Sequence, residues 1–181
     1  MVAFSGATLG VGLAPPDFLS SSVLPDDVQE PDSSGEGRRD ELDLQIFAPV
    51  EEAEADPIER VFGVLGFYRE FLESTQCGMG CPIGNLALEL ADSHLVVRQK
   101  LAQLFDSWCG RVRGYLEDAR NQLPRDVDLD APAQFVLTVM EGGLMQARAA
   151  RSLGPFDAGV AHLRRYFEAL RASAGSQAGS N

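Results

Sequence analysis

The chain is poor in the residues that build metal sites and disulfide frameworks. Its 181 residues include 3 cysteines and 2 histidines. The cysteine count is odd, and none of the cysteines has the paired ligand spacing that zinc requires. A reducing compartment is the simplest explanation of so few cysteines. We therefore expect no disulfide, no metal and no cofactor.

Long apolar runs are also missing. Residues 1–16 are mildly apolar, but they are too short and too rich in glycine to span a bilayer. They also lack the basic residues with which a signal peptide begins. We expect a cytoplasmic protein without a membrane attachment.

Enzyme motifs are absent as well. The sequence contains no G-x-S-x-G and no H-E-x-x-H. The glycines Gly78, Gly80 and Gly84 lack both the G-x-G-x-x-G spacing and the Gly-Lys-Ser/Thr end of a phosphate loop. No acid, base and nucleophile form a recognisable constellation, so we expect that the chain is not an enzyme.

Basic residues are scarce in the first third of the chain. Residues 1–56 contain 13 acidic and 2 basic residues, a net charge of −11, whereas residues 57–181 contain 14 acidic and 13 basic residues, a net charge of −1. The first part also has proline pairs and serine runs without a sustained period. We expect residues 1–44 to be a disordered acidic segment that repels nucleic acid.

Helical periodicity dominates the remainder of the chain. Asp56 is placed to cap a helix that begins with Pro57, and Asp130 is placed to cap a later one. The pattern predicts an all-α bundle over residues 56–172, followed by a flexible tail over residues 173–181. The five predicted helices cover residues 57–76, 82–91, 94–121, 130–151 and 155–172.

The turn after the first of these helices has an unusual composition, with Gly78, Gly80 and Gly84 around Cys81 and Pro82. Glycine reaches backbone angles closed to other residues, and proline suits a first helical turn. If Cys81 caps the helix that opens at Pro82, the helix dipole would lower the pKa of its thiol. The alternative is a buried, inert cysteine.

The last two predicted helices are apolar on more than one side, which favours a partner outside the monomer. The final helix carries apolar residues at the alternating spacing of a heptad seam. A two-fold homodimer through residues 130–151 and 155–172 is the economical arrangement. The candidate interface residues are Phe135, Thr138, Glu141, Gly142, Met145, Phe156, Val160, Leu163, Phe167 and Leu170.

Several segments together resemble the C-terminal domain of TetR-family transcriptional regulators, in particular a subgroup with a G-C-x-x-G-N element. The match runs in order over about residues 57–172, and it implies an all-α domain for effector binding and dimerisation. In this family the last two helices form a four-helix dimer interface. The segments that carry the resemblance are GCPIGNLALELAD, Phe105-x-x-Trp108, Glu141-Gly142-Gly143-Leu144-Met145 with Arg148, and Pro155-Phe156-Asp157.

The resemblance also implies a cavity for a small apolar ligand between the first four predicted helices. Aromatic residues and methionines on these helices fit either such a pocket or a filled core. The candidate lining residues are Phe62, Leu65, Tyr68, Cys81, Asn85, Phe105, Trp108, Val112, Met140 and Leu144.

The start of the chain departs from the family pattern, because acidic residues stand where a basic helix-turn-helix is expected. Residues 45–55 are interpreted as a remnant of the helix that links the two family domains. Either DNA binding has been lost, or the helix-turn-helix is missing from the sequence through a gene-start or reading-frame error. Two hypotheses follow: a homodimeric TetR-like sensor without its own DNA-binding head, or a module that heterodimerises with an intact TetR-family regulator and modulates its DNA binding.

Overall fold

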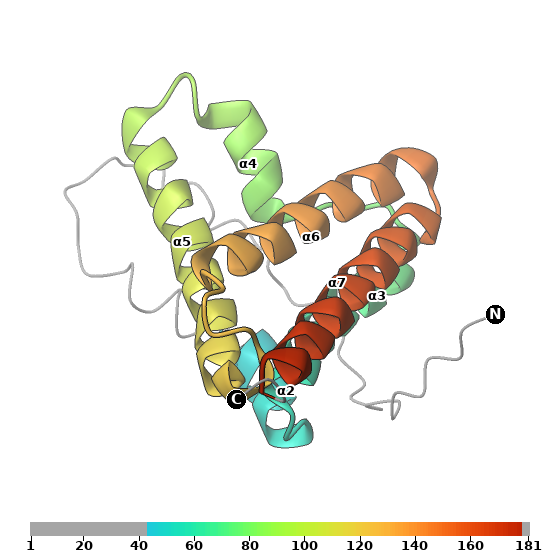
Figure 1. The fold of residues 1–181 in the computed structure, drawn as a ribbon. Helices are drawn as coiled ribbons and strands as arrows, with labels where there is room; N and C mark the ends of the chain where they lie inside the picture. Colours follow the sequence, from blue (N-terminus) through green and yellow to red (C-terminus); the bar gives the residue numbers. More distant parts are fainter. Residues whose placement is uncertain (1–42, 179–181) are drawn as a thin grey trace. The chain divides into compact units, whose positions relative to one another are not determined.

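The computed structural model describes residues 43–178 (Figure 1). The chain divides into two units, residues 1–31 and 32–181, and every described residue belongs to the second. The predicted disorder of residues 1–44 therefore falls almost entirely outside the described part. Between residues 43 and 178 all regular structure is helical and no strand occurs, which confirms the expected all-α class.

Six α-helices and two short helical turns make up the described chain. The predicted bundle corresponds to α3–α7, and a short helix, α2, precedes it directly after a π-helical turn. In order, the elements are the π-turn Asp43–Phe47, α2 Ala48–Ala53, α3 Pro57–Ser74, α4 Pro82–Leu90, α5 Leu95–Asp118, a 3₁₀ turn Arg120–Gln122, α6 Asp130–Ala150 and α7 Gly154–Ala178.

Two helix ends differ from the sequence expectation. α5 stops at Asp118, because the chain there passes into the 3₁₀ turn. α7 continues to Ala178, through most of the segment expected to be a flexible tail. The segment includes Ala174 and Ala178, and alanine has the highest helix propensity of all residues. None of the helices within residues 43–178 has the length and apolar character needed to cross a membrane.

The start of α3 is fixed as the sequence predicts. Oδ1 of Asp56 accepts hydrogen bonds from the amides of Ile58 at 2.8 Å and Glu59 at 3.2 Å, and Pro57 occupies the first turn. The corresponding prediction for α6 is wrong. Asp130 is the first residue of that helix, and its own amide donates to Oδ1 of Asp128 at 3.1 Å.

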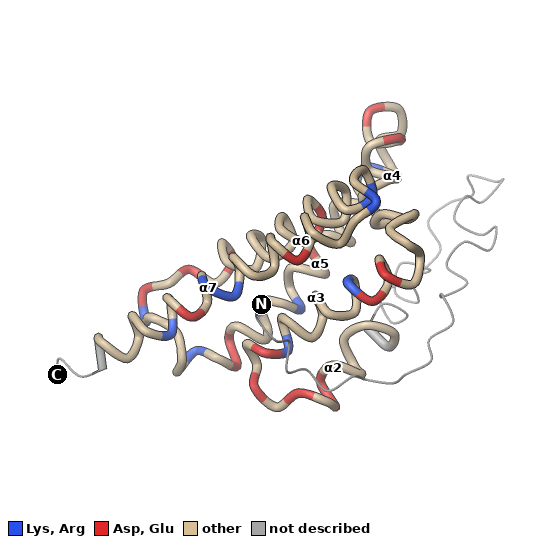
Figure 2. The backbone as a smooth tube through the Cα atoms, turned by 90° about the vertical axis from the view of Figure 1, so that its right-hand side faces the viewer, with Lys and Arg blue, Asp and Glu red and all other residues tan. Residues whose placement is uncertain are grey.

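α3 and α7 lie side by side and are joined by three ion pairs (Figure 1). Acidic and basic positions are interspersed along these helices, whereas α6 is largely uncharged (Figure 2). The pairs fix the register of the two helices at several points along their length. They are Arg69–Asp157 at 2.8 Å, Arg164–Glu59 at 2.7 Å and Arg171–Asp56 at 2.6 Å.

The core fills the space between α3, α5, α6 and α7. Phe62 of α3 meets Phe167 of α7 edge to face, with ring centroids 6.0 Å apart. α6 and α7 approach closely at Gly143, where an added Cβ would lie 2.9 Å from Cδ2 and 3.3 Å from Cα of Phe156. Glycine is therefore needed at this position of α6 for the two helices to reach their observed contact.

α4 is the most loosely held helix of the bundle. None of its nine residues is buried, and Leu88 is 76% exposed. α4 packs beside α5, at the end of α5 far from α2 (Figure 1). Helices with few buried contacts open at a lower free energy than core helices do, so α4 is the wall of the bundle that moves most easily.

Candidate functional site

The turn between α3 and α4 takes its shape from two residues that are not glycine. Gln76 and Cys77 have φ angles of 51° and 53°, and no described glycine has a positive φ. The expectation that the glycines supply unusual backbone angles is therefore wrong. They supply room instead: an added Cβ would lie 2.9 Å from the Thr75 carbonyl oxygen at Gly78, and 2.5 Å from Oε2 of Glu141 at Gly84.

Cys81 caps α4, as the sequence predicts, because its Sγ accepts a hydrogen bond from the Gly84 amide at 3.5 Å. The expected effect on its acidity is reversed. Burial, followed by the neighbouring Glu141 carboxylate, raises the pKa of the thiol to about 12, although amides of the α4 N-terminus act in the opposite direction. The thiol is protonated near neutral pH, which agrees with the alternative of a buried, inert cysteine.

Glu141 reaches across from α6 to the first turn of α4. Burial raises the pKa of its carboxyl group, while a hydrogen bond with Cys81 acts in the opposite direction. Its Oε1 atom is enclosed and has no hydrogen-bond partner among the described residues. The sequence placed Glu141 in the dimer interface; the structure places its carboxylate against α4 instead.

Tyr68 and Trp108 complete this part of the bundle. The indole Nε1 of Trp108 donates a hydrogen bond to the Tyr68 hydroxyl at 3.2 Å. Burial and then the nearby Cys81 raise the pKa of Tyr68, and Glu141 adds to this effect. We call Tyr68, Cys81, Trp108 and Glu141 the polar cluster. It draws its side chains from α3, the cap of α4, α5 and α6.

Most of the other predicted lining residues belong to the core, and Asn85 does not. Leu65, Val112, Met140 and Leu144 are buried in the core, and Phe105 packs against it. Phe62 belongs to the contact between α3 and α7. Asn85 lies beside α6, where its Oδ1 accepts a hydrogen bond from Arg148 at 3.1 Å. No group of three or more potential metal ligands comes together between residues 43 and 178.

The predicted dimer residues of the last helix require a correction. Phe156, Val160, Leu163 and Phe167 are all buried within the single chain, with at most 6% of their surface exposed. The heptad seam of α7 therefore packs against its own domain and is not available to a partner. Leu170 is half-buried against the same core.

The predicted interface residues of α6, unlike those of α7, are mostly exposed. Phe135 is 43% and Met145 is 58% exposed. Thr138 is exposed as well, and Gly142 is half-buried. These four residues face outward from the bundle, unlike the apolar residues of α7.

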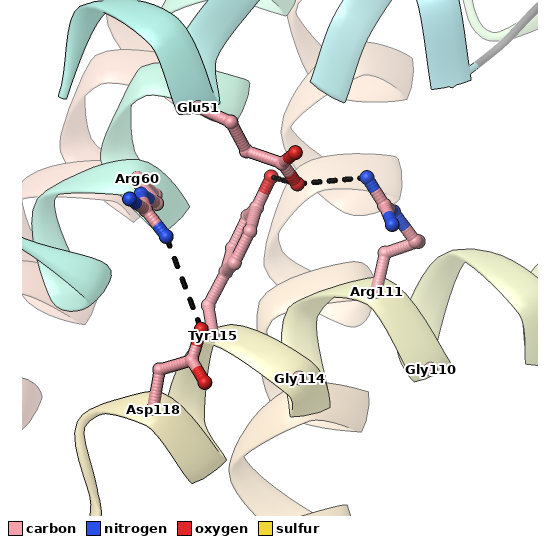
Figure 3. Close-up of a pocket in the computed structure, with 7 residues that line it drawn as sticks. All are labelled: Glu51, Arg60, Gly110, Arg111, Gly114, Tyr115 and Asp118. Atoms are coloured by element: carbon pink, nitrogen blue, oxygen red, sulfur yellow. Dashed lines mark hydrogen bonds and ion pairs between the residues drawn. The ribbon is translucent and has the colours of Figure 1, made fainter. Parts of the chain in front are cut away.

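A second feature, which the sequence did not suggest, is a polar groove between α2, α3 and α5 (Figure 3). Oε1 of Glu51 accepts hydrogen bonds from Arg111 at 2.7 Å and from the Tyr115 hydroxyl at 2.8 Å. Arg60 lies 3.9 Å from Asp118. The groove has a volume of about 290 Å³ and is lined by Glu51, Arg60, Gly110, Arg111, Gly114, Tyr115 and Asp118.

The side chains that line the groove link the short helix α2 to the long helix α5. Its two arginines are balanced by two carboxylates, so its charge favours neither an anion nor a cation. Glu51 lies in the acidic first third of the chain and had only been interpreted as part of a linking remnant. Its partners are about 60 residues away, and no local pattern in the sequence connects them.

The fold is that of bacterial transcriptional regulators. A TetR regulator from Chloroflexus aurantiacus J-10-FL superposes with a TM-score of 0.63 at 23% identity, covering 73% of this chain and 68% of that one. The regulatory protein TetR from Rhodobacter sphaeroides superposes with a TM-score of 0.61 at 20% identity. The superposition covers 72% of this chain and 68% of that one. At these identities the likeness establishes the fold.

The family follows from the sequence match. Residues 57–163 match the family described as "Tetracyclin repressor-like, C-terminal domain". This match covers more than half of the chain, so the chain belongs to that family. The predicted resemblance is thereby confirmed, and the family consists of transcriptional regulators rather than enzymes. The predicted lack of a helix-turn-helix concerns residues outside the described part.

One curated relative is the HTH-type transcriptional repressor DhaR from Mycobacterium sp. (strain GP1). It is 27% identical over 132 residues, which are 72% of this chain and 63% of the relative. The chain thus matches less than two thirds of that relative's length.

Proposed function

We propose that this chain is the sensor and dimerisation part of a TetR-family regulator. It binds a small, mostly apolar ligand between α3, α4, α5 and α6 and forms a homodimer in which the outward face of α6 is the main contact. The observation that carries the proposal is the polar cluster, in which an enclosed carboxylate oxygen has no hydrogen-bond partner among the described residues. Ligand sites combine apolar walls with a few convergent polar groups in this way.

The proposed dimer surface is the outward face of α6. Phe135, Thr138, Gly142 and Met145 follow one another at intervals of three, four and three residues, which lines them up along one side of the helix. Only Asp130, Glu141 and Arg148 are charged along α6, and Figure 2 shows how little charge this helix carries. A second copy packed on this face would cover two large exposed apolar side chains.

The dimer is tested by sedimentation equilibrium at micromolar concentration. The wild-type chain is expected at twice the mass of the monomer, and Met145→Glu is expected to shift the equilibrium to the monomer because it buries an unpaired charge. Leu88→Glu is the matched control, because Leu88 is also highly exposed but lies on α4. A monomeric wild-type chain would contradict the homodimer, and co-purification with an intact regulator would favour the heterodimer hypothesis.

The ligand site is tested with Nile red, a neutral apolar dye. Trp108 is the single tryptophan of the chain and lies in the polar cluster, so energy transfer from Trp108 reports binding nearby. A saturable transfer with one dye per chain is expected. Absence of saturable transfer would contradict the sensor proposal.

A further inference from the structure

One carboxylate oxygen of Glu141 is left without a hydrogen-bond donor. Its Oε1 atom is enclosed, and no donor among the described residues reaches it. An ionisable oxygen removed from water without a hydrogen bond costs more free energy than most other defects of a fold. A titratable group in such an environment is typical of a functional site.

The titratable groups of the polar cluster are all acids. The pKa values of Tyr68, Cys81 and Glu141 are all raised, and no basic side chain is among the causes of any of the three shifts. Two arginines near the turn are engaged elsewhere. Arg148 of α6 donates to Asn85, and Arg151, directly after α6, donates to the carbonyl oxygen of Cys77 at 3.2 Å.

The two oxygens of the Glu141 carboxylate differ. Oε2 lies against Gly84 in the first turn of α4. This contact fixes the position of the carboxylate from one side. Oε1 remains as an oriented acceptor without a donor.

From this geometry we infer that the ligand of this domain carries a protonated amine on an apolar body. The ammonium group donates to Oε1 of Glu141, and the apolar body lies against the aromatic rings of Tyr68 and Trp108, whose faces attract cations. The inference rests on the proposed sensor function and names the ligand class for that same site.

A ligand can reach the enclosed Oε1 atom only if one of the surrounding helices moves. α4 is the surrounding helix with the fewest buried residues. Because none of its nine residues is fully buried, displacing α4 exposes less core surface than displacing a core helix would. Binding would then place the amine against Oε1 of Glu141.

Three probes with the same apolar body test the ligand class: cyclohexylmethylamine, cyclohexylmethanol and cyclohexanecarboxylate. Binding to the full chain is followed by the emission of Trp108. The amine is expected to bind about tenfold more tightly than the alcohol, because its charge adds a charge–charge attraction to the hydrogen bond that both probes donate to Oε1. The carboxylate is expected to bind most weakly, since it faces a carboxylate.

Glu141→Gln separates the role of the charge from the shape of the site. In this variant the preference for the amine over the alcohol is expected to disappear. Glu89→Gln, at an exposed position of α4, is the matched control and should keep the preference. Thermal melting confirms that both variants are folded.

The outcomes distinguish the two proposals. Equal affinity for amine and alcohol, tighter binding of the carboxylate, or an amine preference that survives in Glu141→Gln would each overturn the ligand class. If Nile red still binds in that case, the sensor function stands. If neither Nile red nor any of the three probes binds, the sensor function fails and this inference fails with it.

Discussion

The indole N–H of Trp108 and the hydroxyl of Tyr68 form a hydrogen bond of 3.2 Å that joins α5 to α3 inside the polar cluster. Trp108 also meets Phe47 edge to face, with ring centroids 6.2 Å apart. Phe47 in turn lies directly before α2. The centre of the bundle is thus connected to the first described helix through two contacts of one side chain.

Tyr68→Phe is expected to destabilise the domain by about 1–3 kcal/mol, because the buried indole N–H of Trp108 loses its acceptor. The free energy of unfolding is measured by urea denaturation, and the emission maximum of Trp108 is expected to shift in the same variant. Tyr166→Phe, on the half-buried side of α7, is the control and should leave both quantities almost unchanged. An unaltered emission in Tyr68→Phe would show that the hydrogen bond does not form in solution.

Glu141→Gln is expected to stabilise the domain at neutral pH by about 1 kcal/mol, because it removes a poorly solvated carboxylate. The pKa of Glu141 in the folded chain is raised above its usual 4.5. Its ionised form therefore penalises folding above the folded-state pKa, and the penalty vanishes below about 4.5.

The stability that Glu141→Gln gains over the wild-type chain should accordingly decrease as the pH falls from 8 towards 4.5. Melting curves of both chains at several pH values measure this difference. Glu89→Gln, at an exposed position of α4, again provides the matched control variant. A gain that stays constant with pH would mean that the carboxylate is not ionised in the folded chain.

Gly143→Ala and Gly114→Ala are expected to change stability in opposite directions. An added methyl at Gly143 meets both the ring and the Cα of Phe156, so overpacking between α6 and α7 should cost about 1–3 kcal/mol. At Gly114, which is exposed and has no neighbour within 4 Å of an added Cβ, alanine should add up to about 1 kcal/mol through helix propensity. Equal effects at the two positions would contradict the close approach of α6 and α7.

A thiol reagent at pH 8 is expected to modify Cys109 well before Cys81. Burial and then Asp106 raise the pKa of Cys109, but its side chain is only partly buried. Cys81 is buried and has a pKa of about 12, so only roughly 10⁻⁴ of it is ionised at that pH. Mass spectrometry after brief labelling measures the order, and Cys109→Ser should remove the fast reaction. Rapid modification of Cys81 would show that α4 opens frequently.

Local pattern in the sequence accounts for the helices and for one of their starts. Apolar residues at intervals of three and four specify an amphipathic helix wherever they occur, and Asp56 followed by Pro57 specifies where α3 begins. The family resemblance likewise depended on short segments in a fixed order. These features are local, so they can be identified before any helix is placed against another.

The tertiary structure alone decided which surfaces are inside. The heptad spacing predicts an apolar face on α7, but it does not indicate what covers that face. In the structure, helices of the same chain cover it. The pKa of Cys81 depends on burial by residues far away in sequence, and burial outweighs the dipole of the helix that it caps. The glycines of the turn are required for the space taken by Thr75 and Glu141, a requirement that exists only once the helices are packed.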